Sequence, residues 1–406
     1  MAVLAVRDKA AAGSAKPSPQ ELVARGVEIG KLARAAAAET EKNRTVSPDL
    51  IGKMRDAGLV RIMQPERFGG FEYNYDVFVD VVTAVAAGDG STGWVYSLGA
   101  VHPWLFGCFP DRAQHDVWDN ELDVIAAVSY APTGTATPVE GGHQIAGRWS
   151  FASGVDNANW AIIAGLLSKA DGSKAPGFFL VPKSEFTIDD DWFTMGLAGT
   201  GSKTIVVKET FVPHHRSVLF AELLVGKPPG AEINKNPIYR QPFLSVVPSC
   251  LVAPQIGMAR GALEVFVEQV SGRKTRGAVA GGNNSMANFA TVRMRVAEAS
   301  ACLDAAGLLL HRDLKETAEA AASPEGASLD LRLRNRRDHS FTSRLLVQGV
   351  DALFNAAGGS ALGLHHPLQR FWRDIHAAAA HVSVNWDAVG SMYGQHVFGL
   401  EPKGQY

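Results

Sequence analysis

Histidine side chains offer the clearest acid–base chemistry in this sequence. His381 follows Arg370 and Asp374 by eleven and seven residues, so on one helix the three side chains would point within about 20° of one direction. A neutral imidazole can accept a proton near pH 7. We therefore expect His381 to face the interior of a helical bundle beside Asp374. His376 would lie about 140° away and is the weaker candidate.

A second histidine, His102, lies within an apolar pattern of helical spacing. Trp94 and Leu98 recur on the same side in residues 92–108, which predicts a helix with a buried face. A histidine on such a face is ordinarily a core residue, and a catalytic role is the alternative. Trp94 and Tyr96 are weaker candidates for contact with a substrate.

Residues 124–165 hold the densest cluster of polar and aromatic side chains. Short runs of β-branched and aromatic residues, punctuated by Gly, Pro, Asn and Asp, are typical of strands and turns. Ser129, Trp149 and Ser153 could contact a ligand here, although each could equally be an ordinary turn, strand or core residue. We predict strands at residues 124–128, 143–145, 149–151 and 160–167.

Common nucleotide and metal motifs are missing. No GxGxxG follows a strand, and the loop at residues 196–204 places Ser202 inside the Gly-Lys pair of a phosphate loop and leads into a strand. No HExxH or GxSxG occurs, and two His-His pairs lack further ligands at metal spacing. We expect no metal site.

The composition is that of a globular protein without a broad charged surface. Its 406 residues are 46% apolar with a net charge of −2, so they can bury a core in two or three units and offer no extended basic surface for nucleic acid or anionic lipid. Charges interrupt the apolar run near the N-terminus, and no uncharged run is long enough to span a bilayer. Three scattered cysteines fit a reducing compartment. We expect a cytoplasmic protein without nucleic-acid or membrane partners.

The elements that must position these residues change type along the chain. Helix-start signals at Ser18, Ser47 and Asn74 predict a helical region before the strands. After the proline-rich segment 226–242, helical periodicity at 248–270, 285–317, 328–357 and 367–393 suggests an antiparallel bundle. We therefore predict a mainly α protein with three domains: N-terminal helical 1–120, middle β 121–225 and C-terminal four-helix bundle 226–406.

This order and several local motifs resemble the acyl-CoA dehydrogenase fold, with a barrel-like β domain, across nearly the whole chain. PERFGGFEYNYDVFVDVVTAVAAGDGSTGW resembles its N-terminal stretch, AAVSYAP and GRWSFASGVDNANW its flavin-binding strands, and PLQRFWRDIHAAAAH its C-terminal Arg-Asp helix. The match is closest to the oxygenase components of two-component flavin-dependent monooxygenases. His381-Val382 occupies one common position of the dehydrogenases' catalytic glutamate, and GSTGWVYSLGAVHPW places His102 near the flavin as in the oxygenases.

The resemblance implies an enzyme that receives reduced FAD or FMN from a separate NAD(P)H-dependent flavin reductase. With O₂ it would form a C4a-hydroperoxyflavin and hydroxylate a small phenolic or aromatic substrate, and it would assemble as a homotetramer. His381 would act as the general base on the phenol, and His102 would orient the hydroperoxide or substrate. The alternatives are an acyl-CoA dehydrogenase-type flavin oxidoreductase and a flavin-free binding or scaffold protein with the same fold.

Cofactor contacts are implied for both ends of the flavin. Ser129 and Ser153 would hydrogen-bond the ring edge, and Trp149 would lie against the ring. A guanidinium fork suits phosphates, and glycine allows close backbone approach. The matching residues at the phosphate end are Arg273, with Arg276 as a competing match, and Gly358 and Gly359, which would contact the flavin of a neighbouring subunit.

Overall fold

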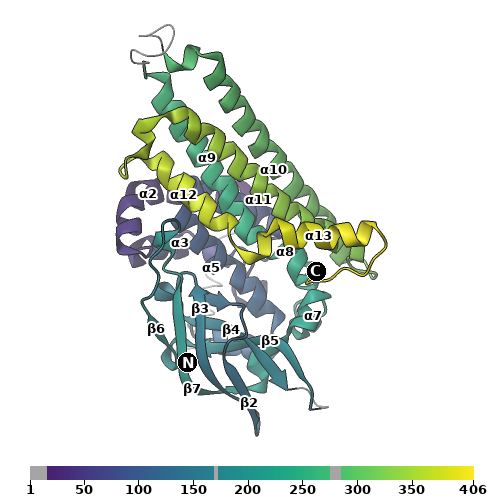
Figure 1. Ribbon diagram of the computed structural model, residues 1–406. Helices are drawn as coiled ribbons and strands as arrows, with labels where there is room; N and C mark the ends of the chain where they lie inside the picture. The colour runs from purple at the N-terminus through teal and green to yellow at the C-terminus, as the bar shows by residue number, and fades with distance from the viewer. Residues whose placement is uncertain (1–15, 169–171, 275–284) are drawn as a thin grey trace.

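Helices lie before and after a β region that forms one end of the molecule (Figure 1). The computed structural model describes residues 16–168, 172–274 and 285–406. The long C-terminal helices extend away from the strands, and α5 runs towards them. The order of helices, strands and helical bundle is as predicted.

The N-terminal helices begin at the predicted capping residues. Oγ of Ser18 accepts a hydrogen bond from the backbone N of Glu21, while the Glu21 carboxylate accepts from the backbone N of Ser18 at 2.7 Å. Oδ1 of Asn74 likewise accepts from the first residue of its helix. The helices are α2 (Pro19–Asn43), α3 (Pro48–Asp56), α4 (Tyr75–Ala86), α5 (Gly90–Cys108) and α6 (Asp111–Trp118).

The β region consists of two four-stranded sheets, ordered β1-β4-β5-β8 and β2-β3-β7-β6. Apolar side chains from both sheets, such as Ile163 and Ile205, share one core. The two strands predicted at 143–145 and 149–151 are a single strand, β3, whose pairing with β7 shifts register twice. The strands are β1 (Ala126–Ser129), β2 (Thr135–Val139), β3 (Gly142–Ala152), β4 (Trp160–Ser168), β5 (Lys174–Pro182), β6 (Thr187–Asp189), β7 (Lys203–Pro213) and β8 (Ser217–Leu219).

The C-terminal helices pack around a buried central helix, α9. The segment Phe243–Ser271 is long and apolar enough to cross a membrane by length and composition alone, and 78% of its most apolar window is buried within the fold. The helices are α7 (Phe220–Leu224), α8 (Phe243–Val246), α9 (Ser249–Ser271), α10 (Ala290–Ala322), α11 (Leu329–Ala357), α12 (Pro367–Ala379) and α13 (Trp386–Val397).

The prediction of one helix over residues 367–393 is wrong. Helix α12 ends at Ala379, a short 3-10 turn covers Val382–Val384, and α13 begins at Trp386. Two side chains stabilise this break by capping the turns that follow it. The imidazole of His381 accepts a hydrogen bond from the backbone N of Ser383, and the amide oxygen of Asn385 accepts one from the backbone N of Ala388. His381 therefore lies in a loop and does not share a helical face with Asp374.

Helix α12 is fixed to the rest of the fold by its Arg-Asp pair. Nε of Arg370 lies 2.9 Å from the Glu41 carboxylate of α2, and Oδ1 of Asp374 accepts from the backbone N of Leu197 at 2.6 Å. At these atoms the two side chains bind different parts of the fold and not each other. Their role in the structure is to dock α12 against α2 and the loop before β7.

Candidate active site

Helix α5 presents Trp94 towards the end of strand β3. Oδ2 of Asp89 caps the helix by accepting hydrogen bonds from the backbone N and Oγ1 of Thr92, at 2.8 and 2.7 Å. Trp94 is buried, and its Nε1 donates to Oγ of Ser153 at 3.2 Å. The centroid of its ring lies 6.2 Å from that of His381. The fold thus brings together three candidate residues, one from each part of the chain.

A chain of hydroxyl groups orients Ser153. Oγ1 of Thr200 donates to the carbonyl O of Leu197 at 2.8 Å, so its one hydrogen is used there. Ser202 must then donate to Thr200 across 2.6 Å, and Ser153 must donate to Ser202 across 2.7 Å. Since Trp94 donates to Ser153, the hydroxyl of Ser153 keeps one lone pair that can accept a further hydrogen bond.

The loop after α12 fixes the tautomer of His381. The backbone N of Ser383 donates to its Nδ1 at 3.1 Å, so in the neutral ring the hydrogen is on Nε2. Burial and the positive charge of Arg336 lower the pKa of His381 to about 4, and the ring is therefore neutral at pH 7. This geometry contradicts the expected general-base role, because the free nitrogen is a donor.

His102 has the opposite tautomer. Its Nδ1 lies 2.7 Å from the carbonyl O of Ala126 in β1, and because a carbonyl only accepts, Nδ1 carries the hydrogen and Nε2 is an acceptor. Burial lowers the pKa of His102 to about 4. Trp94 and His102 are separated by about 12 Å along the axis of α5 and by about 80° around it. His102 is thus the imidazole that can accept a hydrogen bond.

Ser129 and Tyr96 use their hydroxyl hydrogens within the fold. Ser129 ends β1, is buried, and donates to the carbonyl O of Ser150 at 2.8 Å. Tyr96 is 2% exposed and donates to the carbonyl O of Leu59 at 3.0 Å. The hydroxyl of Tyr96 is therefore held within the fold and its contact with a substrate stays a prediction, whereas Ser129 still has lone pairs at the strand end.

The aromatic residue next to Ser153 is Phe151, not Trp149. Trp149 is 1% exposed in the β core and donates to the carbonyl O of Ala164 at 2.9 Å, so protein encloses its ring, and its contact with a flavin stays a prediction. The register shift between Trp149 and Ala152 turns the next residues over. Phe151 is 72% exposed as a result, with a positive φ of 63°. The sequence signal that distinguishes Phe151 was weak, because a regular strand would place the rings of Trp149 and Phe151 on the same side.

The predicted phosphate-binding residues form one cluster at the end of the bundle. Nη1 of Arg273 donates to the carbonyl O of Ala357 at 2.7 Å, and exposed Gly358 follows with a positive φ of 71°. Gly359 is exposed beside it, whereas Arg276 lies outside the described residues. Arg273 and Gly358 belong to the same chain and would contact the same group. Arg273 follows the C-terminal end of α9, a helix about 34 Å long, and the strands lie at the opposite end of the molecule (Figure 1).

His376 is not part of the Trp94 cluster. Its Nε2 lies 3.0 Å from Oδ1 of Asp351, and its ring packs 4.4 Å from that of Trp372. His376 and Asp351 border an open groove of about 720 Å³ between α11, α12 and α13. The recorded partners of His376 are therefore different from those of the Trp94 cluster.

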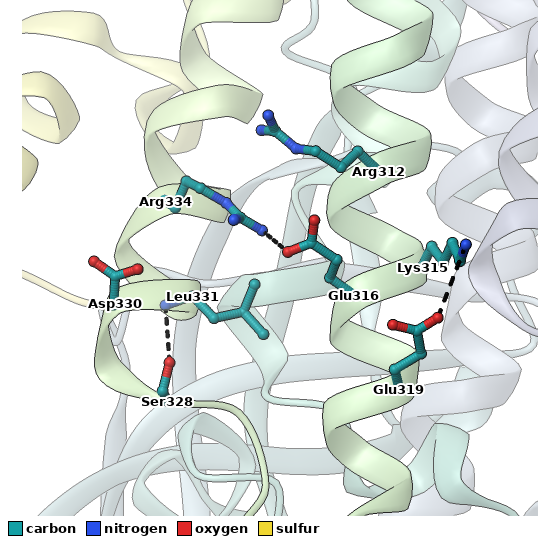
Figure 2. Close-up of a pocket in the computed structure, with 8 residues that line it drawn as sticks. All are labelled: Arg312, Lys315, Glu316, Glu319, Ser328, Asp330, Leu331 and Arg334. Carbon is teal, nitrogen blue, oxygen red and sulfur yellow. Dashed lines mark hydrogen bonds and ion pairs between the residues drawn. The ribbon is translucent and has the colours of Figure 1, made fainter.

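A second open groove, of about 690 Å³, lies between α10 and α11 (Figure 2). Charged side chains line it: Arg334 pairs with Glu316, and Lys315 with Glu319. The close-up shows Arg334 of α11 directed at Glu316 of α10, whereas Lys315 and Glu319 face each other along α10. Such a charged surface does not suit an aromatic ring, and it lies away from the Trp94 cluster.

The chemistry of the two clusters fits a flavin. At one end, the exposed ring of Phe151 lies two residues before Ser153, so the same turn offers an aromatic face and a hydroxyl, as a flat ring with a polar edge requires. At the other end, the guanidinium of Arg273 lies beside the open backbone of Gly358, a combination that suits phosphate. Ser153 and Phe151 would hold the ring, and Arg273 the phosphates.

Two protein-family models match this chain and identify its fold family. Residues 28–109 match the acyl-CoA dehydrogenase N-terminal domain, and residues 249–386 match the acyl-CoA dehydrogenase C-terminal domain. The predicted fold class is thereby confirmed. The β region lies between the two matched segments.

Individual relatives define the branch. The chain is 44% identical to the oxygenase component of FADH(2)-dependent resorcinol hydroxylase from Rhizobium sp. (strain MTP-10005), over 95% of this chain and 96% of that protein. The crystal structure of 3-HSA hydroxylase from Rhodococcus sp. RHA1 superposes with a TM-score of 0.90 at 37% identity, covering 95% of this chain and 98% of that one. XiaF from Streptomyces sp., in complex with FADH2 and glycerol, gives a TM-score of 0.87 at 25% identity, covering 95% and 97%.

The chain belongs to the family of oxygenase components of two-component flavin-dependent monooxygenases. It is a flavin-dependent enzyme of the acyl-CoA dehydrogenase fold, as its motifs predicted.

Proposed function

We propose that this oxygenase hydroxylates a phenolic ring, using O₂ and reduced flavin that a separate NAD(P)H-dependent reductase supplies. The observation that carries the proposal is the cluster of Trp94, Ser153 and His381, which combines an aromatic wall, a hydroxyl with a free lone pair and an imidazole N–H. The name of the resorcinol hydroxylase relative supports the same substrate class. Reduced flavin, when bound, supplies the electrons that activate O₂.

The side chains of the cluster have distinct roles in this proposal. Ser153 would accept a hydrogen bond from an N–H at the edge of the reduced flavin ring, and Phe151 would pack against that ring. His381 donates its Nε2–H to the hydroxyl oxygen of the substrate and thereby orients the ring and stabilises negative charge on that oxygen. His102 provides an acceptor further along α5, and Ser129 a second polar group at the strand end.

The phosphate cluster supports a shared site between subunits. Because Arg273 and Gly358 lie at the far end of the bundle from Ser153, we infer that they hold the phosphates of a flavin whose ring occupies a neighbouring subunit, within a homotetramer. Flavin binding should then stabilise the assembly. Light scattering of Arg273→Ala, with and without reduced flavin, tests this. A monomer with wild-type flavin affinity would contradict it.

Several finer features follow the same proposal. We infer reduced FAD as the first choice of cofactor and FMN as the alternative, a small aromatic molecule as substrate, and a cytoplasmic location. We also keep the proposed division into units 1–120, 121–225 and 226–406. Helix boundaries at Trp118 and Ser249 and strand boundaries at Ala126 and Leu219 agree with this division.

Single-turnover mixing tests the proposed activity. The protein with photoreduced FAD, oxygen and resorcinol should give hydroxylated product, and omission of the protein should give only hydrogen peroxide. Product analysis by chromatography across a panel of phenols would also identify the preferred substrate. Absence of product from every phenol, with anaerobic reduction of bound flavin by an acyl-CoA, would instead support the dehydrogenase alternative.

A further inference from the structure

Arg336 on α11 carries a buried positive charge that no carboxylate among the described residues neutralises. Its side chain is almost fully enclosed, at 6% exposure for the residue. Nη1 donates to the carbonyl O of Ser383 at 2.9 Å, and its buried Nε has no hydrogen-bond partner in the part of the chain that the structure describes. Within those same residues no carboxylate pairs with it, and burial lowers the pKa of Arg336 to about 10. It remains charged at pH 7.

The neighbouring residues do not neutralise this charge. Asp338, two residues further along α11, is directed at Arg312 and Arg337 instead. His339, one turn along the same helix, is 1% exposed, and neither ring nitrogen has a partner among the described residues. A buried charge without an opposite charge beside it is strongly destabilising. A buried guanidinium of this kind, next to an imidazole without hydrogen-bond partners, is therefore a candidate ligand-binding site.

The charge of Arg336 acts at the proposed active site. The carbonyl that it binds belongs to the loop that carries His381, and Ser340 holds the same loop through the carbonyl O of Val384 at 2.6 Å. Burial and the charge of Arg336 both lower the pKa of His381 and of His339. One cation and two neutral imidazoles therefore lie close enough to interact electrostatically.

We propose that Arg336 is the counter-charge for the ionised ring oxygen of the substrate, so that the enzyme binds its phenol as phenolate beside His381. The proposal rests on the proposed function, since it names the ionisation state of that substrate. A phenolate ring is the stronger nucleophile towards electrophilic oxygen, and an opposite charge close by favours the ionised form. His339 contributes a second neutral N–H donor to the same oxygen.

Binding of 4-nitrophenol tests the proposal without turnover, because its phenolate is yellow. We expect the ligand bound to wild-type protein to ionise about one pKa unit or more below free 4-nitrophenol. Arg336→Gln, which can still donate to the carbonyl of Ser383, should abolish this shift, whereas Arg336→Lys should retain most of it. Ser340→Ala, which loosens the same loop without changing charge, is the matched control and should also retain the shift.

A measurement on wild-type protein alone keeps the test independent of variant folding. Affinity for 4-nitrophenol should rise with pH between 5.5 and 8.5, while affinity for 4-nitroanisole, which cannot ionise, should stay constant. His381 and His339 remain neutral over this range, and Arg336 remains charged. An unshifted ionisation in the wild type, or an equal shift in Arg336→Gln, would overturn the role of Arg336 while leaving the proposed function to the product assay.

Discussion

Replacement of Asp374 by Asn should remove a pH-dependent loss of stability. The carboxyl group is 2% exposed, and Oδ2 has no hydrogen-bond partner among the described residues. Burial and the nearby charge of Asp89 raise the pKa of Asp374 from 3.8 to about 7. Asn has the same shape and can still accept the hydrogen bond from the backbone N of Leu197. The variant therefore differs from the wild type mainly in lacking ionisation.

The sign and size of the effect follow from the raised pKa. The folded state holds its proton up to about pH 7, whereas an unfolded aspartate releases it near pH 4. Stability contributed by the neutral carboxyl group is present in full below about pH 4 and is lost as pH rises to 7. At about 1.36 kcal/mol per pKa unit, the full loss is at most about 4 kcal/mol. The advantage of Asp374→Asn should therefore be about 2–3 kcal/mol larger at pH 8 than at pH 5.

Urea unfolding followed by tryptophan fluorescence, for both proteins at pH 5, 6, 7 and 8, measures this difference. Each comparison is made at one pH, so the titration of all other groups cancels to first order. Asp304→Asn, on the exposed side of α10, is the control for removing one surface charge. A constant difference between wild type and Asp374→Asn from pH 5 to 8 would refute the argument, because it would mean that Asp374 is ionised throughout.

Four further predictions concern the flavin and substrate residues. His381→Gln, which keeps a donor, should retain more product than His381→Phe, whose loss of one hydrogen bond to a charged oxygen should lower the hydroxylation rate about tenfold or more; equal product from both would exclude the donor role. His102→Ala should lower kcat about 10²-fold if its Nε2 takes part in proton transfer, and stopped-flow rates unchanged from wild type would assign it to the core. Phe151→Ala should weaken the binding of reduced FAD, measured by equilibrium dialysis, without changing the melting temperature. Trp149→Ala should instead lower the free energy of unfolding by about 3–5 kcal/mol. The reverse pattern would identify Trp149 as the flavin contact. Ser153→Ala should divert oxygen from product to hydrogen peroxide, and unchanged coupling in a peroxidase assay would make the serine structural.

Much of the fold could be read from local signals. Capping residues such as Ser18 and Asn74 set helix starts to within a residue, because a cap acts on the backbone immediately next to it. The period of apolar residues distinguished the strands from the bundle helices. The identity of the family followed from motifs such as GRWSFASGVDNANW, which are also contiguous in sequence.

Irregular backbone was the limit of that reading. The break between α12 and α13 moved His381 into a loop, and the register shift in β3 exchanged Phe151 for Trp149 on the outer face. A prediction from periodicity assumes that each element continues regularly. A bulge turns the following side chains of a strand to the other face, and a helix end removes the following residues from the shared helical face. Neither event had a local signal strong enough to outweigh the regular pattern.

The sequence by itself determined the types of element, their order and most of the residues that meet at the proposed site. Only the tertiary structure decided what those residues can do. The tautomer of His102 and the direction of the hydroxyl chain at Ser153 depend on partners far along the chain. The tautomer of His381 depends on the loop in which the break after α12 places it, and the burial of Arg336 depends on exclusion of water. Hydrogen-bond direction and the pKa of a buried group are set by neighbours in space, and those neighbours are fixed only when the fold closes.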